Sequence, residues 1–123
     1  MKKILIVEDQ SDIRRLIRWA LEDERFELFE ASEGSAGLSA AGLVKPDLIL
    51  LDVMMPGELD GYQVCTQVKA NPDLASIKVV LLSARAQATD LKAGEDAGCD
   101  AYLIKPFKPS QLVETVKRLL STA

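Results

Sequence analysis

The 123-residue sequence contains no histidine. This absence excludes hydrolases with a Ser/His/Asp triad, Cys/His proteases, histidine-ligated zinc sites and any phosphohistidine carried by the chain itself. Any chemistry at a site in this chain must therefore use carboxylates, hydroxyls and lysines.

Cysteine is scarce, and excess positive charge and long apolar runs are lacking. Cys65 and Cys99 form no CxxC pair and lie among apolar residues, which is typical of reduced structural cysteines in a cytosolic protein. With 15 Lys and Arg against 19 Asp and Glu, the net charge of −4 argues against broad binding to nucleic acid or anionic membranes. No apolar run is long enough to span a bilayer, and the run at 4–7 is too short for a signal peptide. We therefore expect a cytoplasmic protein with no nucleic-acid or membrane partner.

The length and composition suit one globular domain. A chain of 123 residues is too short for two well-packed domains, and 48% hydrophobic with 28% charged residues is ordinary for a soluble fold. We expect a single domain over residues 1–123, with one core and one site.

Short apolar, β-branched runs alternate five times with segments of helical periodicity. Strict alternation implies a parallel sheet with helices on both faces. The first, third and fourth runs are continuously apolar and so belong at the centre, whereas the second and fifth are mixed and belong at the edges. The sequence therefore predicts a doubly wound, flavodoxin-like (βα)5 α/β fold with strand order 2-1-3-4-5 and a ligand site at the carboxyl ends of the strands. The predicted strands are 4–7, 26–29, 48–51, 79–82 and 101–104, and the predicted helices are 11–24, 34–44, 60–71, 87–97 and 109 to the end of the chain.

Several features define these helices. Asp60 with Gln63 forms a capping-box pattern, and Pro109 suits a first helical position. The second helix is weakened by glycine at 37 and 42. Arginines at 14, 15 and 18 are predicted to face solvent. The first helix has an apolar stripe made by Ile13, Leu16, Ile17, Ala20 and Leu21.

Polar residues follow the strands at one predicted edge of the sheet. Each alone could be a turn or capping residue, but together they suggest a site. Three carboxylates at 4 Å would repel by about 4 kcal/mol per pair at an effective dielectric constant of 20, so the pocket favours a cation. Oxygen ligands without His or Cys suit Mg²⁺ or Mn²⁺. These residues are Glu8, Asp9, Asp52, Ser83, Lys105 and Pro106.

A divalent cation, a lysine and a hydroxyl around a carboxylate suit phosphoryl transfer to aspartate, with Asp52 as the nucleophile. A flavin- or dinucleotide-binding domain would need a Gly-, Ser- or Thr-rich loop after the first strand, but 8–12 reads EDQSD. A phosphatase of the haloacid dehalogenase type remains an alternative. It is disfavoured because such enzymes place a second aspartate two residues after the nucleophile, where this sequence has Met54.

Four motifs spread over essentially the whole chain resemble the receiver domain of two-component response regulators. The resemblance implies that Asp52 accepts a phosphoryl group from a sensor histidine kinase or a histidine phosphotransfer protein. Self-phosphorylation and self-dephosphorylation would then be the only catalysis, so the chain is not expected to be an enzyme in the usual sense. A receiver-like module that binds without being phosphorylated is a further alternative. The motifs are ILIVED at 4–9, LLDVMMPG at 50–57, LLSA at 81–84 and YLIKPF at 102–107.

The resemblance also assigns roles at the site. Glu8, Asp9 and Asp52, with the backbone carbonyl of Met54, would hold Mg²⁺. Ser83 and Lys105 would contact the phosphoryl oxygens.

Phosphorylation would be read out through a switch. Ser83 would turn inward and Tyr102 would change rotamer, which biases a protein-binding surface toward a downstream target and leaves open a phosphorylation-dependent dimer. The peptide bond to Pro106 would be cis. Met54 and Arg85 occupy positions that tune dephosphorylation in the family, and we expect these bulky side chains to slow hydrolysis.

The sequence departs from the family pattern at two places. One extra residue, around Glu58 and Leu59, lengthens the loop after Asp52, and we interpret it as a neutral insertion in preference to an adjustment of metal or partner binding. Serine stands at 83, where threonine is more usual, and it keeps the hydroxyl. The last predicted helix, which follows the YLIKPF motif, runs to the end of the sequence, which suggests a stand-alone regulator or an excised part of a longer one.

Overall fold

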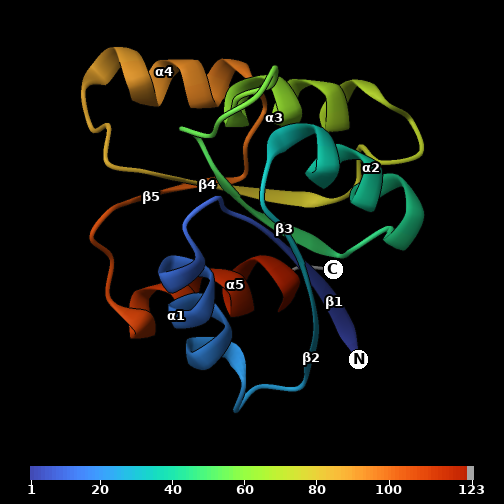
Figure 1. Cartoon of the computed structure of the whole chain (residues 1–123), viewed down its shortest axis with the longest axis vertical. Helices are drawn as coiled ribbons and strands as arrows, with labels where there is room; N and C mark the ends of the chain where they lie inside the picture. The colour runs from blue at the N-terminus through green and yellow to red at the C-terminus, as the bar shows by residue number, and fades with distance from the viewer. Residues whose placement is uncertain (122–123) are drawn as a thin grey trace.

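The computed structural model describes residues 1–121 as a five-stranded parallel sheet with helices on both faces (Figure 1). The strand order is β2-β1-β3-β4-β5, and every adjacent pair is parallel. The predicted fold class and strand order are therefore confirmed. The strands are β1 (Lys2–Val7), β2 (Phe26–Ala31), β3 (Leu48–Asp52), β4 (Lys78–Ser83) and β5 (Ala101–Ile104). The helices are α1 (Ser11–Leu21), α2 (Gly34–Val44), α3 (Gly61–Ala70), α4 (Ala88–Asp96) and α5 (Pro109–Ser121).

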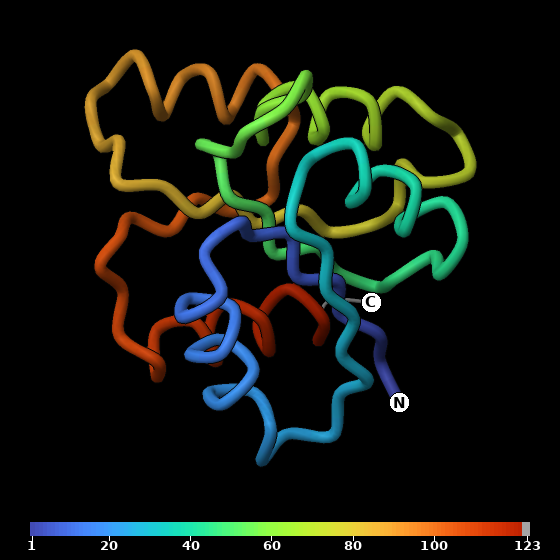
Figure 2. Tube along the Cα trace, viewed as in Figure 1, coloured from blue at the N-terminus to red at the C-terminus, as the bar shows by residue number. Residues whose placement is uncertain are grey.

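The sheet separates two apolar cores. Helices α1 and α5 cover one face and α2, α3 and α4 the other, as the chain trace in Figure 2 shows. Because successive strand residues point to opposite faces, Ile4 and Ile6 pack with α1 and α5, whereas Leu5 and Val7 pack on the other side. All five residues of β3 are buried, while those of β2 are at most half-buried, as expected for a central and an edge strand.

The apolar stripe of α1 is narrower than predicted. Ile17 and Leu21 are fully buried, but Leu16 is 40% exposed. Leu16 lies at the margin of the helix interface and lines a shallow apolar cavity of about 290 Å³ with Ile13 and Phe107. Phe107 itself packs against the core beneath α5.

Helix ends also differ from the prediction. Helix α1 ends at Leu21, and the predicted segment up to residue 24 forms a turn instead. The strands extend one or two residues beyond most predicted bounds, so that Asp52 and Ser83 are the last residues of their strands. Helix α5 begins at Pro109 as predicted, and the predicted end at residues 122–123 lies outside the described residues.

Both cysteines are free thiols, in line with the prediction. The Cys65 thiol is buried and donates a hydrogen bond to the Ala97 carbonyl at 3.3 Å. Burial raises the pKa of this thiol to about 12, so it is inert near neutral pH. Within residues 1–121, no helix has the length and apolar character needed to cross a membrane.

The start of α3 is locked to the end of β3. Asp60 accepts a hydrogen bond from the Gln63 amide, and the Gln63 side chain accepts one from the Asp60 amide, both at 2.9 Å, which confirms the predicted capping box. The next residue, Gly61, donates to the Val53 carbonyl at 2.9 Å. A Cβ atom at Gly61 would overlap the Asp52 carbonyl oxygen, so the backbones approach closely at this point. This contact fixes the loop that follows Asp52.

Two glycine substitutions are expected to act in opposite directions. Gly61→Ala forces the α3 backbone away from Asp52 and should destabilise the protein by about 1–3 kcal/mol. Gly42→Ala, in α2, meets nothing within 4 Å and should stabilise it by about 1 kcal/mol. Urea unfolding of both variants tests this pair, and equal effects of the same sign would contradict the close approach at Gly61.

Candidate functional site

The strand register gathers the predicted polar residues at one edge of the sheet. Glu8 follows the last residue of β1, and Asp52 and Ser83 are the last residues of β3 and β4. Ser83 pairs with Ile104, which places Lys105 just beyond the same edge. Residues far apart in the sequence therefore meet because parallel strands end together.

Lys105 joins two of the three carboxylates. Its Nζ donates to Glu8 Oε1 at 2.7 Å and to Asp52 Oδ1 at 3.1 Å. Glu8 is fully buried and Asp52 is 4% exposed, so both ion pairs are shielded from solvent. The Lys105 amide donates to the Ser83 carbonyl at 2.8 Å, and the Lys105–Pro106 peptide bond is cis.

Burial opposes charge at this site. It raises the pKa of Glu8 from an ordinary value of 4.5 to about 7, although the Lys105 ammonium acts to lower it. Burial also raises the pKa of Asp52, again against the effect of Lys105. For Lys105, burial alone would lower the pKa, but the hydrogen bonds to Glu8 and Asp52 outweigh it and the pKa is raised. The lysine is therefore firmly charged, while its carboxylate partners are short of positive charge.

The donor set fits a hard divalent cation. One carboxylate oxygen from each of Glu8, Asp9 and Asp52 lies within 4.8 Å of the other two. All three ligands are oxygens, as Mg²⁺ and Mn²⁺ prefer, and one ammonium does not neutralise three carboxylates. A cavity of about 220 Å³ adjoins the cluster, and the exposure of Asp9 and Met54 shows that it reaches the surface. It is lined by Asp9, Gln10, Asp52, Met54, Ala84 and Lys105.

Ser83 and Tyr102 meet through the backbone of Arg85. The Ser83 hydroxyl is buried and accepts a hydrogen bond from the Arg85 amide at 3.0 Å. The Tyr102 hydroxyl donates to the Arg85 carbonyl at 3.1 Å. The Arg85 side chain is directed to α4, where its guanidinium lies 4.0 Å from Asp90, and it does not line the cavity.

Sequence reasoning missed Tyr62. Its hydroxyl lies 3.1 Å from the Tyr102 hydroxyl and 3.1 Å from the Asp90 carbonyl. Burial raises the pKa of Tyr62, followed in importance by its contact with Tyr102, so its hydroxyl keeps its proton at neutral pH. The apolar pattern of α3 gives no sign of this bond, because the partner comes from β5.

The prediction that Arg14 faces solvent is wrong. Its Nη1 donates to the Glu8 carbonyl at 2.6 Å and to the Asp9 carbonyl at 3.2 Å. Its Nε donates to Glu30 of β2 at 3.2 Å. The helical pattern alone placed Arg14 opposite the apolar stripe, and only the path of the preceding loop reveals these acceptors.

The insertion near Glu58 is partly anchored. Glu58 is exposed, whereas Leu59 packs against the core under α2 and α3. The preceding Gly57 has φ +99°, a conformation that favours glycine.

Fold and site together define a doubly wound α/β domain with an acidic edge whose oxygen donors fit a divalent cation. Nucleotide-binding domains of related architecture carry a glycine-rich loop at this position instead. The family model described as "Response regulator receiver domain" matches residues 4–117. The chain belongs to this family, the receiver domains of two-component response regulators.

Curated relatives agree with this membership. The chain is 40% identical over 121 residues to the transcriptional regulatory protein ResD of Bacillus subtilis, covering 98% of this chain and 49% of the relative. It is 38% identical over 119 residues to the alkaline phosphatase synthesis transcriptional regulatory protein PhoP of the same organism, covering 97% of this chain and 48% of the relative. The chain thus spans about half the length of these relatives.

Solved structures show the same fold. A putative response regulator from Chloroflexus aurantiacus superposes with a TM-score of 0.91 at 32% identity, covering 98% of each chain. The signal receiver domain of a signal transduction histidine kinase from Syntrophus aciditrophicus gives a TM-score of 0.91 at 36% identity, covering 98% of this chain and 91% of that one.

The raised pKa of Glu8 predicts an unusual pH dependence of stability. A carboxyl whose pKa is higher in the folded chain binds protons more tightly there, so stability falls as pH rises from about 4.5 through about 7. The sequence has no histidine to titrate in this range. Urea unfolding in EDTA should therefore give a lower free energy at pH 8 than at pH 6.

Mg²⁺ should reverse this loss at pH 8. A tenfold excess over its dissociation constant stabilises the folded state by about 1.4 kcal/mol. Glu8→Gln should flatten the pH dependence in EDTA and reduce the stabilisation by Mg²⁺. A wild-type protein equally stable at pH 6 and pH 8 would contradict the electrostatic account.

Proposed function

We propose that this chain is a phosphoacceptor signalling domain of a two-component system or phosphorelay, with Asp52 as the acceptor. One observation supports it above the others. The Asp52 carboxylate is almost fully buried, yet it lines a surface cavity and accepts a hydrogen bond from Lys105. A buried carboxylate held in this way is oriented for attack without being free to move.

The proposed reaction takes the phosphoryl group from a phosphohistidine of a sensor histidine kinase or a histidine phosphotransfer protein. An Asp52 oxygen attacks phosphorus, a P–O bond forms and the P–N bond to the donor imidazole breaks; the imidazole leaves with the electron pair and takes up a proton from water. Water later cleaves the aspartyl phosphate to inorganic phosphate and restores the carboxylate. These two reactions at its own Asp52 are the only catalysis proposed for the chain.

Mg²⁺ or Mn²⁺ bound by Glu8, Asp9, Asp52 and the Met54 carbonyl would supply positive charge opposite the phosphoryl oxygens. Lys105 contributes the second positive charge. Its ammonium has three donors and already bonds Asp52 and Glu8, so it can shift one bond to a phosphoryl oxygen without leaving the site.

The proposed switch starts at Ser83. When its hydroxyl turns to a phosphoryl oxygen, the Arg85 amide loses its acceptor, and the Arg85 carbonyl that holds Tyr102 is free to move. The Tyr102 ring lies directly under α4, where a Cβ on Gly94 would come within 2.8 Å of it. A change of rotamer at Tyr102 would therefore shift the surface of α4 and β5. This surface is the proposed contact for a downstream protein target or for a phosphorylation-dependent dimer.

A phosphorylation assay tests the acceptor. Incubation with Mg²⁺ and acetyl phosphate should add one phosphoryl group to the intact mass of the wild type, and Asp52→Asn should abolish the addition. Asp23→Asn, at an exposed carboxylate in the turn after α1, is the matched control and should behave as the wild type. A wild type that gains no mass, or an Asp52→Asn variant labelled at the wild-type rate, would overturn the proposal.

Shielding by Met54 should set the lifetime of the phosphorylated state. Met54 lines the cavity beside Asp52 while remaining 54% exposed, so Met54→Ala opens a path for water. We expect a several-fold shorter phosphoryl half-life, measured by release of inorganic phosphate. The Arg85 side chain is directed to α4 and does not line the cavity, so Arg85→Ala should change the half-life less than Met54→Ala does. An unchanged half-life in Met54→Ala would count against a shielding role.

A further inference from the structure

We infer that Arg14 is a positioning residue that holds the Glu8–Asp9 segment in its cation-binding arrangement. This inference rests on the proposed function in one respect, that the carboxylates of this segment are there to bind Mg²⁺. None of the four family motifs in the sequence includes Arg14.

The guanidinium contacts both residues of the acidic segment through their backbone. One nitrogen, Nη1, donates to the Glu8 carbonyl at 2.6 Å and to the Asp9 carbonyl at 3.2 Å. The carboxylates of the same two residues meet Asp52 on the cavity side. Arg14 therefore fixes the main chain while leaving the metal-ligating oxygens untouched.

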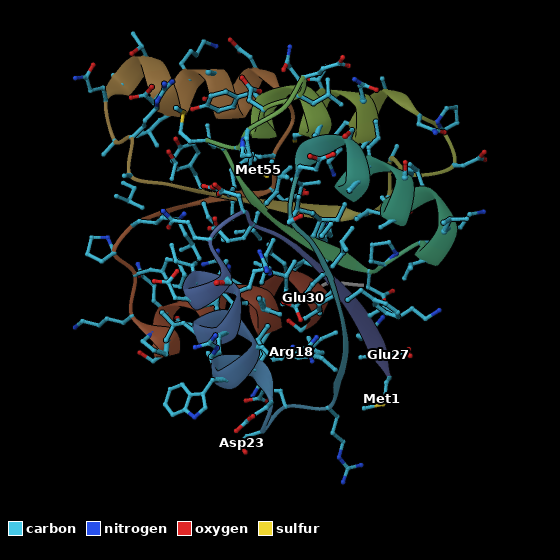
Figure 3. The ribbon with its side chains drawn as sticks, viewed as in Figure 1. Met1, Arg18, Asp23, Glu27, Glu30 and Met55 are labelled. Carbon is cyan, nitrogen blue, oxygen red and sulfur yellow. The ribbon has the colours of Figure 1, made fainter. Side chains whose placement is uncertain are left out.

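Arg14 is itself anchored from the other side. Its Nε donates to Glu30 Oε1 at 3.2 Å, and the second Glu30 oxygen, Oε2, accepts from Arg18 Nε at 2.9 Å. Figure 3 shows Arg18 of α1 and Glu30 of β2 next to one another. Because guanidinium is planar and has five donors in a fixed geometry, one end can hold the loop while the other holds β2.

This anchoring matters because the carboxylates of the Glu8–Asp9 segment repel each other and Asp52. The negative charges on Glu8, Asp9 and Asp52 repel one another. Asp9 lies in an exposed loop, which this repulsion would push away from the other two carboxylates. A backbone hydrogen bond positions Glu8, because its N–H donates to the Ala31 carbonyl at 3.0 Å. Arg14 extends that restraint to Asp9 through the carbonyl bond, so the three carboxylates stay together before a cation arrives. Such preorganisation raises cation affinity, in the way that groups outside the ligand shell commonly do.

Arg18 provides a matched control. It lies one turn further along α1 and bonds the same Glu30, but its side chain is 45% exposed and its ion pair joins only α1 to β2. Loss of Arg18 removes the same charge without touching the Glu8 and Asp9 carbonyls.

The test is calorimetric titration of the full chain with Mg²⁺ alone. Arg14→Gln should raise the dissociation constant about tenfold, whereas Arg18→Gln should change it less than about twofold. Arg14→Lys should recover only part of the loss, because an ammonium cannot span two carbonyls and Glu30 at once. Glu30→Gln, which leaves Arg14 in place but loosens it, should give an intermediate increase.

Urea unfolding identifies any variant that fails to fold. If Arg14→Gln does not fold, the Mg²⁺ affinities of Glu30→Gln and Arg14→Lys test the inference in its place. Unchanged affinity in Arg14→Gln, or an equal loss in Arg18→Gln, would overturn the inference, as would a wild type that binds no Mg²⁺.

A second readout separates positioning from general damage. In the acetyl phosphate assay, Arg14→Gln should need about tenfold more Mg²⁺ for half-maximal phosphorylation while reaching the wild-type rate at saturation. A lower rate at saturating Mg²⁺ with an unchanged Mg²⁺ requirement would contradict a positioning role. The two proposals also fail separately: a wild type that binds Mg²⁺ but never gains a phosphoryl group overturns the acceptor function alone.

Discussion

The ion pairs of Lys105 are the interaction on which the functional edge of this fold depends. A single ammonium bonds Glu8 at the end of β1 and Asp52 at the end of β3, and its own residue follows β5. The two carboxylates are almost fully buried and Lys105 is largely so, and an unpaired charge at such a buried position would be costly. Lys105 therefore allows two carboxylates to be buried together at the carboxyl ends of the strands. The third, on Asp9, remains at the surface, where a cation could enter.

The residues of the site are held in two different ways, by the sheet at Asp52 and by loop hydrogen bonds at Ser83 and Tyr102. β3 is buried along its whole length, and Gly61 locks the following loop, so Asp52 is held in place by the backbone. At the carboxyl end of β4, Ser83 and Tyr102 are joined by two hydrogen bonds to the backbone of Arg85, a residue of the loop that follows the strand. Tyr62 adds an alternative partner for Tyr102. The two tyrosine hydroxyls have two hydrogens between them but make three short contacts: with each other, with the Asp90 carbonyl and with the Arg85 carbonyl. The hydrogens can therefore be redistributed among these contacts without a large movement of the side chains.

The sequence predicted the strand order and the acidic edge because both follow from local patterns. Continuous apolar runs identify buried strands, and the residues directly after such strands meet at one edge of the sheet. This rule predicted that Asp52 and Lys105 belong to one site although they are 53 positions apart in the sequence. Leu16 was misplaced because helical periodicity gives the direction of a stripe but not the width of the surface that covers it. Arg14 and Tyr62 were missed for a different reason. Their partners are backbone carbonyls and a hydroxyl from other elements, and such acceptors leave no pattern in the sequence.

The absence of histidine acquires a structural meaning at the cavity. The proposed phosphoryl donor is an imidazole, which these 123 residues do not contain, and we propose that it approaches Asp52 through the surface opening at Asp9 and Met54. Asp52 is 4% exposed, so only a small part of its carboxylate faces the opening. A site closed further would exclude the donor, and one more open would admit water to the aspartyl phosphate. We propose that the side chains at the rim of the opening, above all Met54, adjust the balance between phosphoryl transfer and hydrolysis.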